Sequence, residues 1–221
     1  MIALVRAFLL HELRLSLRGS GGVGMTLSFF LLAALIIPFS VGNEPGLLVR
    51  IGPGVLWVAL VLATLISLEH LFQADYEDGS LDLLILSPLP LTFIAVLKAL
   101  VHWLTCALPL ILAIPLVGLL YGLDGASLRA LMLAMTVGTP ALSFLGAVVA
   151  ALCLSVRRGG LLVALLLLPL FVPILIFGVM AADVSQGQAA HAAFLFLCAF
   201  NLATLALAPY VVARAIKLHL D

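Results

Sequence analysis

The chain has 221 residues, of which 65% are hydrophobic and only 9% are charged, and its formal net charge at neutral pH is zero. Soluble domains carry about 25% charged residues, so the composition excludes an ordinary soluble protein. The balanced charge also excludes a large basic surface for nucleic acid. We therefore expect an all-α polytopic membrane protein, with residues 1–221 forming a single transmembrane domain.

Residues 1–18 are predicted to form an amphipathic helix that lies in the membrane interface. Apolar side chains recur in it at helical spacing, and Arg6, Arg14 and Arg18 lie on its other sides. Arginine side chains at this depth can contact lipid phosphates. The glycine-rich stretch 19–22 separates this helix from the first predicted span.

Six stretches are long enough and apolar enough to cross a bilayer, whose core of roughly 30 Å needs about 20 helical residues. Residues 91–123 carry one formal charge, Lys98, and residues 161–182 carry none. Pro169 and Pro173 leave open whether the fifth span is continuous or re-entrant. The predicted spans are residues 23–41, 51–72, 91–121, 128–156, 161–182 and 192–213.

Half of the carboxylates gather between the second and third predicted spans, since five of the ten acidic residues lie within residues 69–82. Acidic side chains stabilise the first turn of a helix, and the leucine-rich run that follows favours a short helix over a solvated loop. Such a helix, held outside the membrane, is typical of a segment that docks into a groove of another protein. The candidate docking residues of this cytoplasmic loop, 73–90, are Asp75, Glu77, Asp78, Gly79, Leu81, Leu84 and Ile85.

No pattern for catalysis or for metal binding is recognised. Residues 19–26 have the spacing of a phosphate-binding loop, but Met25 stands where that loop requires lysine. His102 and His191 have no second ligand at a recognisable spacing, so we do not expect them to ligate haem iron. The three cysteines are 47 and 45 residues apart, which fits no zinc or redox motif. We expect the chain itself to hold no catalytic residue, metal or cofactor.

A longer pattern joins the acidic loop to the third predicted span. Its residues are Phe72, Asp75, Asp78, Gly79, Leu81, Leu84, Leu86, Ser87 and Pro88, followed by Lys98, His102, Trp103, Leu108, Pro109, Leu110, Pro115 and Leu116. This pattern resembles the CcmB family, the B subunits of the haem exporter in cytochrome c maturation. The length, the six spans and the N-terminal arginine-bearing helix also fit, so the resemblance covers essentially the whole chain.

The resemblance implies an ABC-2-type permease subunit without enzyme activity, in the bacterial inner membrane. In that family the loop after the second span is a coupling helix seated on a separate CcmA-type ATPase, which binds ATP and magnesium. Two copies of each subunit would assemble with CcmC and CcmD. ATP hydrolysis would then release the haem-loaded periplasmic chaperone CcmE, with haem as a ligand that the complex transports or handles.

Two alternatives to this function stay open at the level of the sequence. One is a non-transporting membrane scaffold for assembly, and the other is an ABC-2-type exporter of a different substrate.

The distribution of lysine and arginine predicts that both termini lie in the cytoplasm. Eight of the ten basic residues fall on the cytoplasmic side of this six-span arrangement, and only Arg50 and Arg129 fall outside. Single cysteines placed within residues 76–86 or 214–221 should therefore resist a membrane-impermeant thiol reagent in intact cells. Labelling of either stretch from outside would contradict the orientation.

Overall fold

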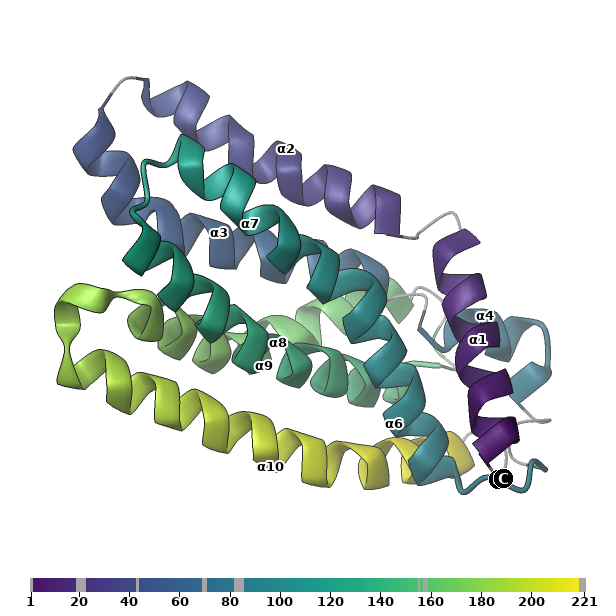
Figure 1. Cartoon of the computed structure of the whole chain (residues 1–221). Helices are drawn as coiled ribbons and strands as arrows, with labels where there is room; N and C mark the ends of the chain where they lie inside the picture. Colours follow the sequence, from purple (N-terminus) through teal and green to yellow (C-terminus); the bar gives the residue numbers. More distant parts are fainter. Residues whose placement is uncertain are drawn as a thin grey trace.

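All regular structure in the computed structural model of the chain is helical within the residues that the structure describes (Figure 1). The predicted all-α class is therefore confirmed. The described residues are 2–18, 23–42, 44–68, 71–81, 86–154, 156 and 159–218.

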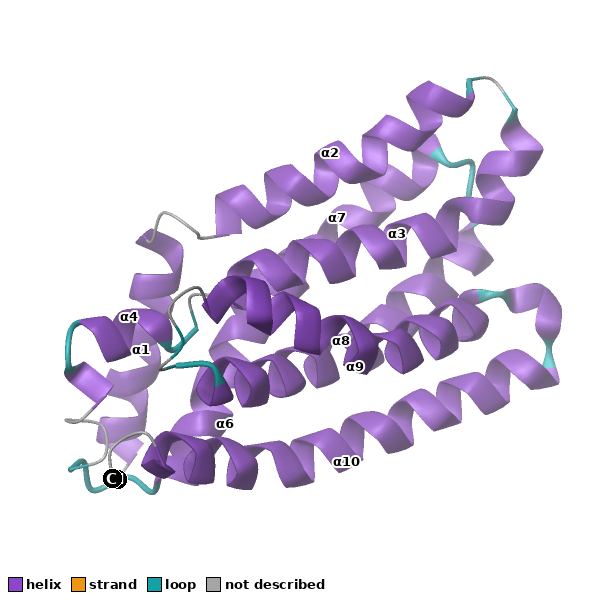
Figure 2. Ribbon diagram, turned by 180° about the vertical axis from the view of Figure 1, so that it is seen from behind, coloured by secondary structure: helices purple, strands orange, loops and turns teal. Residues whose placement is uncertain are grey.

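In the described part of the chain, six helical segments are long and apolar enough to cross a membrane, as the sequence predicted. They lie roughly side by side in one bundle (Figures 1 and 2). The helices that form it are α2 (Val23–Val41), α3 (Pro45–Leu68), α6 (Leu91–His102) continued by the π-helical turn η1 (Trp103–Ala107) and α7 (Leu108–Leu120), α8 (Gly125–Leu152), α9 (Gly159–Ala182) and α10 (Gln188–Leu218).

The ends of these helices differ from the predicted spans in an informative way. α10 extends beyond residues 192–213 at both ends, because a helix can continue past the hydrocarbon region. α9 runs without a break through Pro169 and Pro173, so the fifth span is one continuous helix. A short 3₁₀ turn, η2 (Val184–Gln186), joins α9 to α10.

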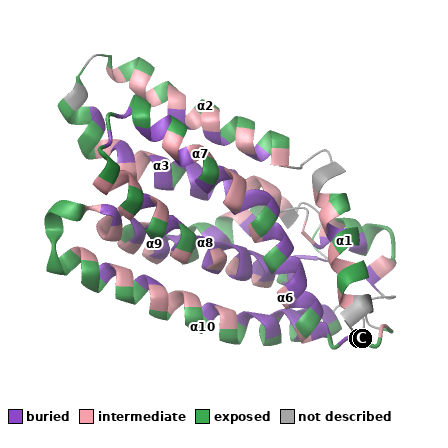
Figure 3. Cartoon of the chain, viewed as in Figure 1, coloured by how far each residue is buried: buried purple, intermediate pink, exposed green. Residues whose placement is uncertain are grey.

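α8 is the central helix of the bundle. It packs against α3, α6, α7, α9 and α10. In its most apolar stretch of 18 residues, 61% of the residues are buried, compared with 17% in the corresponding stretch of α2. Figure 3 shows this difference as many buried residues along α8 and a mixture of buried, intermediate and exposed residues on α2 and α10. Small residues let helices approach closely in a membrane, where water does not drive them together. Those buried in α8 include Ala134, Gly138, Ala141, Ser143, Gly146, Ala147, Ala150 and Ala151.

α1 (Ile2–Arg18) is the helix expected over residues 1–18, and it crosses one end of the bundle instead of running along it (Figures 1 and 2). The short helix α4 (Gln73–Glu77) lies at the same end. The start of α6 and the end of α10 meet α1 there, through a small apolar cluster of Leu89, Leu91, Ile94 and Ala213 packed against Val5 and Phe8.

A single indole ring joins three of the spans. Trp57 of α3 is fully buried, and its ring lies directly against Gly138 of α8 and Gly178 of α9. A Cβ atom at Gly178 would fall inside van der Waals contact with this ring. An indole is rigid, so it cannot bend away as the end of a leucine or lysine could.

Gly178→Ala is therefore expected to destabilise the protein by roughly 1–3 kcal/mol, the usual cost of overpacking a filled core. Gly54→Ala is the matched control, because a Cβ atom there meets nothing within 4 Å. Thermal unfolding in detergent should show a lower Tm for Gly178→Ala and an unchanged or slightly higher Tm for Gly54→Ala. Equal melting temperatures for the two variants would contradict the tight contact at Trp57.

Candidate functional site

The acidic segment after α3 forms a short helix that ends in a tight turn. α4 is followed by Asp78 and then by Gly79, whose φ of 75° lies in the left-handed region that favours glycine. Asp78 Oδ1 accepts a hydrogen bond from the backbone N–H of Ser80 at 2.8 Å, as in an Asx turn. Hydrogen bonds from Ser80 hold the pKa of the Asp78 carboxyl below its usual value, so this side chain is negatively charged at neutral pH.

Part of the predicted docking set forms an outward-facing surface. Glu77, Asp78 and Gly79 are exposed, and Gln73 Nε2 donates a hydrogen bond to Glu77 Oε1 at 2.8 Å. Among the described residues, none lies within 4 Å of a Cβ atom built on Gly79, so its role among them is the turn itself. Two further members, Leu84 and Ile85, lie outside the described residues.

Asp75 and Leu81, by contrast, point into the chain, which differs from the expectation that the whole set faces a partner. Leu81 is 2% exposed and belongs to an apolar cluster with Phe72, Ala95 and Ala99. Asp75 is also buried. The physical reason for its burial is a cation on the neighbouring span, which is Lys98.

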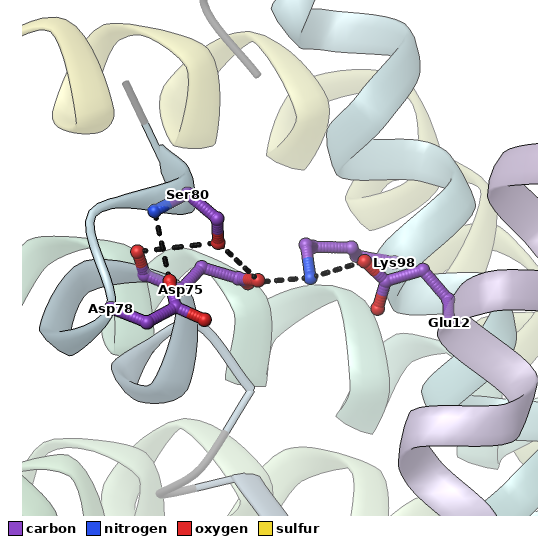
Figure 4. A network of polar contacts seen from close by, with 5 residues as sticks. All are labelled: Glu12, Asp75, Asp78, Ser80 and Lys98. Carbon is purple, nitrogen blue, oxygen red and sulfur yellow. Dashed lines mark hydrogen bonds and ion pairs between the residues drawn. The ribbon is translucent and has the colours of Figure 1, made fainter. Parts of the chain in front are cut away.

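Lys98 is the centre of a buried triad of charges (Figure 4). Its Nζ atom lies 2.7 Å from Glu12 Oε1 and 2.7 Å from Asp75 Oδ2. The side chains of Lys98, Glu12 and Asp75 are only 2%, 10% and 13% exposed, respectively. Ser80 Oγ donates a further hydrogen bond to Asp75 Oδ1 at 3.2 Å, and the ammonium lies 5.7 Å from the centre of the Phe72 ring.

This Glu12–Lys98–Asp75 triad ties together three elements that are far apart in the sequence. Glu12 comes from α1, Asp75 from α4 and Lys98 from α6. An ammonium buried in apolar surroundings is costly unless oppositely charged groups and hydrogen bonds surround it. The triad therefore fixes how the acidic segment and α1 sit on the third span.

A polar cavity of about 280 Å³ lies next to the triad. Besides the triad, its walls include Ser67, His102 and Cys106. The hydroxyl of Thr26, also on the wall, is buried and makes no hydrogen bond of ordinary geometry within the described residues. Its neighbour is the Cys106 thiol, which is a weak hydrogen-bonding group. Walls of this kind accommodate ordered water.

His102 lies one helical turn after Lys98 in α6, and both nitrogens of its ring form hydrogen bonds. Its Nε2 atom is 2.8 Å from Ser67 Oγ on α3, and its Nδ1 atom is 2.9 Å from Ser143 Oγ on α8. A neutral imidazole donates through one nitrogen and accepts through the other, so both of its bonds are satisfied. Next to it, Trp103 Nε1 donates to Thr139 Oγ1 at 2.9 Å. His102 thus pins the third span to its neighbours.

The sequence analysis missed Glu12 and Lys98 as site residues, and it missed the two serines that bond His102. A usable signal was present for Lys98, because a lone charge inside a long apolar run nearly always has a charged partner. Within the described residues, no group of three or more His, Cys, Asp or Glu side chains is placed to hold a metal ion.

Residues 3–219 match the model of a protein family described as CcmB protein. The chain belongs to the CcmB family. The matched range contains all three residues of the triad as well as the acidic turn, and it confirms the resemblance found on the loop and third-span residues.

Three CcmB relatives, each named heme exporter protein B, illustrate how far the similarity extends. The protein from Paracoccus denitrificans is 50% identical over 219 residues, which cover 98% of this chain and 100% of the relative. The Pseudomonas aeruginosa protein is 43% identical over 95% of both chains. The Escherichia coli K12 protein is 40% identical over 95% of this chain and 96% of the relative.

The bonding of His102 leads to a prediction about haem. Because both ring nitrogens bond to serines, His102→Ala should leave cytochrome c maturation largely intact. It should instead lower stability by about 1–3 kcal/mol, because the buried Ser143 hydroxyl loses this hydrogen bond while Ser67 keeps its bond to the carbonyl of Thr64. Haem-stained cytochrome c, normalised to the amount of the protein in membranes, measures the first effect, and Tm measures the second.

His191→Ala is the control, because His191 is exposed at the start of α10. It should change neither maturation nor Tm. Complete loss of maturation at normal protein level in either variant would point to direct haem handling by that histidine.

Proposed function

We propose that this chain is the permease subunit of an ABC-type haem export complex in the bacterial inner membrane. In this proposal it couples ATP hydrolysis by a separate CcmA-type ATPase to haem delivery, or to release of the haem-loaded periplasmic chaperone CcmE. Membership of the CcmB family and relatives named heme exporter protein B support the proposal. The observation that carries the coupling role is an exposed acidic turn whose base is anchored inside the permease.

The outer surface of the turn is the proposed docking site for the ATPase. Glu77 and Asp78 offer two negative charges to a basic surface, and Gly79 lets the backbone approach closely. Tyr76, adjacent to them in the chain and 39% exposed, adds apolar surface. Leu84 and Ile85 belong to the proposed interface on sequence grounds.

The inner residues have a different role in the proposal. A displacement of the ATPase reaches the membrane only if the docked segment is fixed to a span. Asp75 supplies the polar attachment through Lys98, and Leu81 supplies the apolar attachment through the cluster with Phe72. Anchor and docking surface thus lie on opposite sides of one short segment.

The other parts of the function fall to other subunits. ATP and magnesium would bind to the ATPase, and a second copy of this chain, CcmC and CcmD would complete the membrane part. With both termini in the cytoplasm, the acidic turn faces the compartment where an ATPase finds ATP. Haem enters the proposal as a ligand that the complex handles.

Reversing the two exposed charges tests the docking surface while leaving both members of the anchoring ion pair in place. Glu77→Lys combined with Asp78→Lys keeps Asp75 and Lys98 but removes the turn hydrogen bond between Asp78 and Ser80, so insertion and Tm are measured alongside binding. One exposed ion pair contributes only about 0–1 kcal/mol, but exchanging attraction for repulsion at two sites should weaken ATPase binding by about tenfold or more. Co-purification in mild detergent and binding titration measure the loss.

Glu44→Lys is the matched control. Glu44 is also exposed, but it lies in the loop between α2 and α3 at the opposite end of the bundle (Figure 1). It should keep ATPase binding unchanged. If the double reversal recovers the ATPase in normal amount, this turn is not the docking site.

A further inference from the structure

α1 is attached to the bundle along a narrow strip, with hollows on two of its sides. It packs mainly against α6 and η1. The polar cavity of about 280 Å³ opens on one side, along Glu12, Leu15 and Ser16. An apolar groove of about 730 Å³ opens on another, between Leu9 and Phe93 among other residues. A helix flanked by hollows gains little from close packing there.

The strip contains two kinds of contact. Val5 and Phe8 pack on the apolar cluster at the start of α6, and apolar contacts of this kind have little directional preference. The ion pair between Glu12 and Lys98, at 2.7 Å, is the directional one. The position of α1 on the bundle therefore depends on Lys98.

The same ammonium holds the acidic segment through Asp75, also at 2.7 Å. A displacement of α4 by a docked ATPase acts first on this pair. Breaking this pair would leave the largely buried Asp75 without its cation and Lys98 with Glu12 alone, so α6 and α1 follow α4 more readily than the pair breaks.

The third span contains a possible hinge directly after α6, at the π-helical turn η1. α6 ends at His102, which is bonded to Ser67 and Ser143, and the π-helical turn η1 begins at the next residue. π-helical turns are rare and frequent at functional sites. Pro109 adds to this, since its ring cannot fit against the carbonyl of Thr105 in a regular α-helix.

We propose that Lys98 is a positioning residue that makes α1, α4 and α6 move as one body about η1. The inference rests on the proposed function in one respect, which is that a docked ATPase displaces α4. The attachment of α1 to Lys98 through Glu12 does not depend on that function. It assigns to α1 a part in coupling: α1 changes position whenever the acidic segment does.

The composition of the triad provides a clean variant. Glu12→Leu detaches α1 yet leaves Lys98 and Asp75 as a one-to-one pair, so no buried charge loses all its partners. Arg14→Leu is the matched control, because Arg14 is exposed on the same helix. Glu12→Gln is a second, shape-conserving variant that should act more weakly in the same direction.

The first measurement uses the purified chain alone in phosphatidylcholine nanodiscs. In Glu12→Leu, amide hydrogen exchange in residues 2–18 should become about tenfold to a hundredfold faster, as expected for losing a hydrogen bond between charged groups. Exchange in α8 should not change, and Arg14→Leu should match the wild type. If α1 exchanges at the wild-type rate in both Glu12 variants, Lys98 does not position it.

The second measurement uses the complex with the ATPase, with and without a non-hydrolysable ATP analogue. In the wild type, the analogue should change exchange in both residues 71–81 and residues 2–18. In Glu12→Leu the response of residues 71–81 should persist while that of residues 2–18 disappears, which a purely structural role would not produce. Two outcomes would overturn the inference. One is that the analogue leaves exchange in residues 2–18 of the wild type unchanged. The other is that residues 2–18 still respond to the analogue in Glu12→Leu.

The two measurements separate this inference from the proposed function. If no ATPase binds the wild-type chain, the proposed function fails, and the exchange of the isolated chain still decides whether Lys98 positions α1.

Discussion

The ammonium of Lys98 is the constraint around which one end of this protein is built. It is the single formal charge in the apolar third span, and burying it without partners would cost several kcal/mol. Two carboxylates from distant parts of the chain, Glu12 and Asp75, come to it. The acidic segment and the N-terminal helix therefore take their places because of an electrostatic requirement on the third span.

The rest of the bundle is held by a different kind of force. In the bilayer core, apolar side chains are surrounded by equally apolar lipid, so the hydrophobic effect does not drive helices together. They associate through close packing and through hydrogen bonds between them. The small residues of α8 and the contact of Trp57 with two glycines supply the packing. The bonds of His102 to α3 and α8 supply the polar part. The protein thus combines a tightly packed centre with a charged and more open end.

Hydropathy was sufficient to predict the six spans, because each is a long apolar stretch and a membrane admits few other structures. The helix ends were harder to predict, since α10 continues beyond the hydrocarbon length. The π-helical turn had one local sign, Pro109, but proline in a span does not specify which turn widens. Continuity of α9 through two prolines depends on its neighbours, which local sequence does not contain.

The acidic segment illustrates why site geometry needed the structure. Its charge and its place between spans were visible in the sequence, but α4 has only five residues, too few for periodicity to reveal an inward face. That Asp75 and Leu81 turn inward while Glu77 and Asp78 turn outward depends on Lys98 and on Phe72. The pairing of Glu12 with Lys98 spans more than eighty residues, and no local pattern encodes it.

The stoichiometry of the triad has a consequence for what the neighbouring cavity can admit. Two carboxylates share one ammonium, and Asp78 adds a third carboxylate to the cavity wall, where Lys98 is the one lysine or arginine among the described residues that line it. The wall is therefore electronegative, which repels anions and attracts water and cations. A ligand that carries carboxylates of its own, as haem does, meets an unfavourable field there. The described part of this wall thus disfavours anionic ligands by charge, whatever their size or shape.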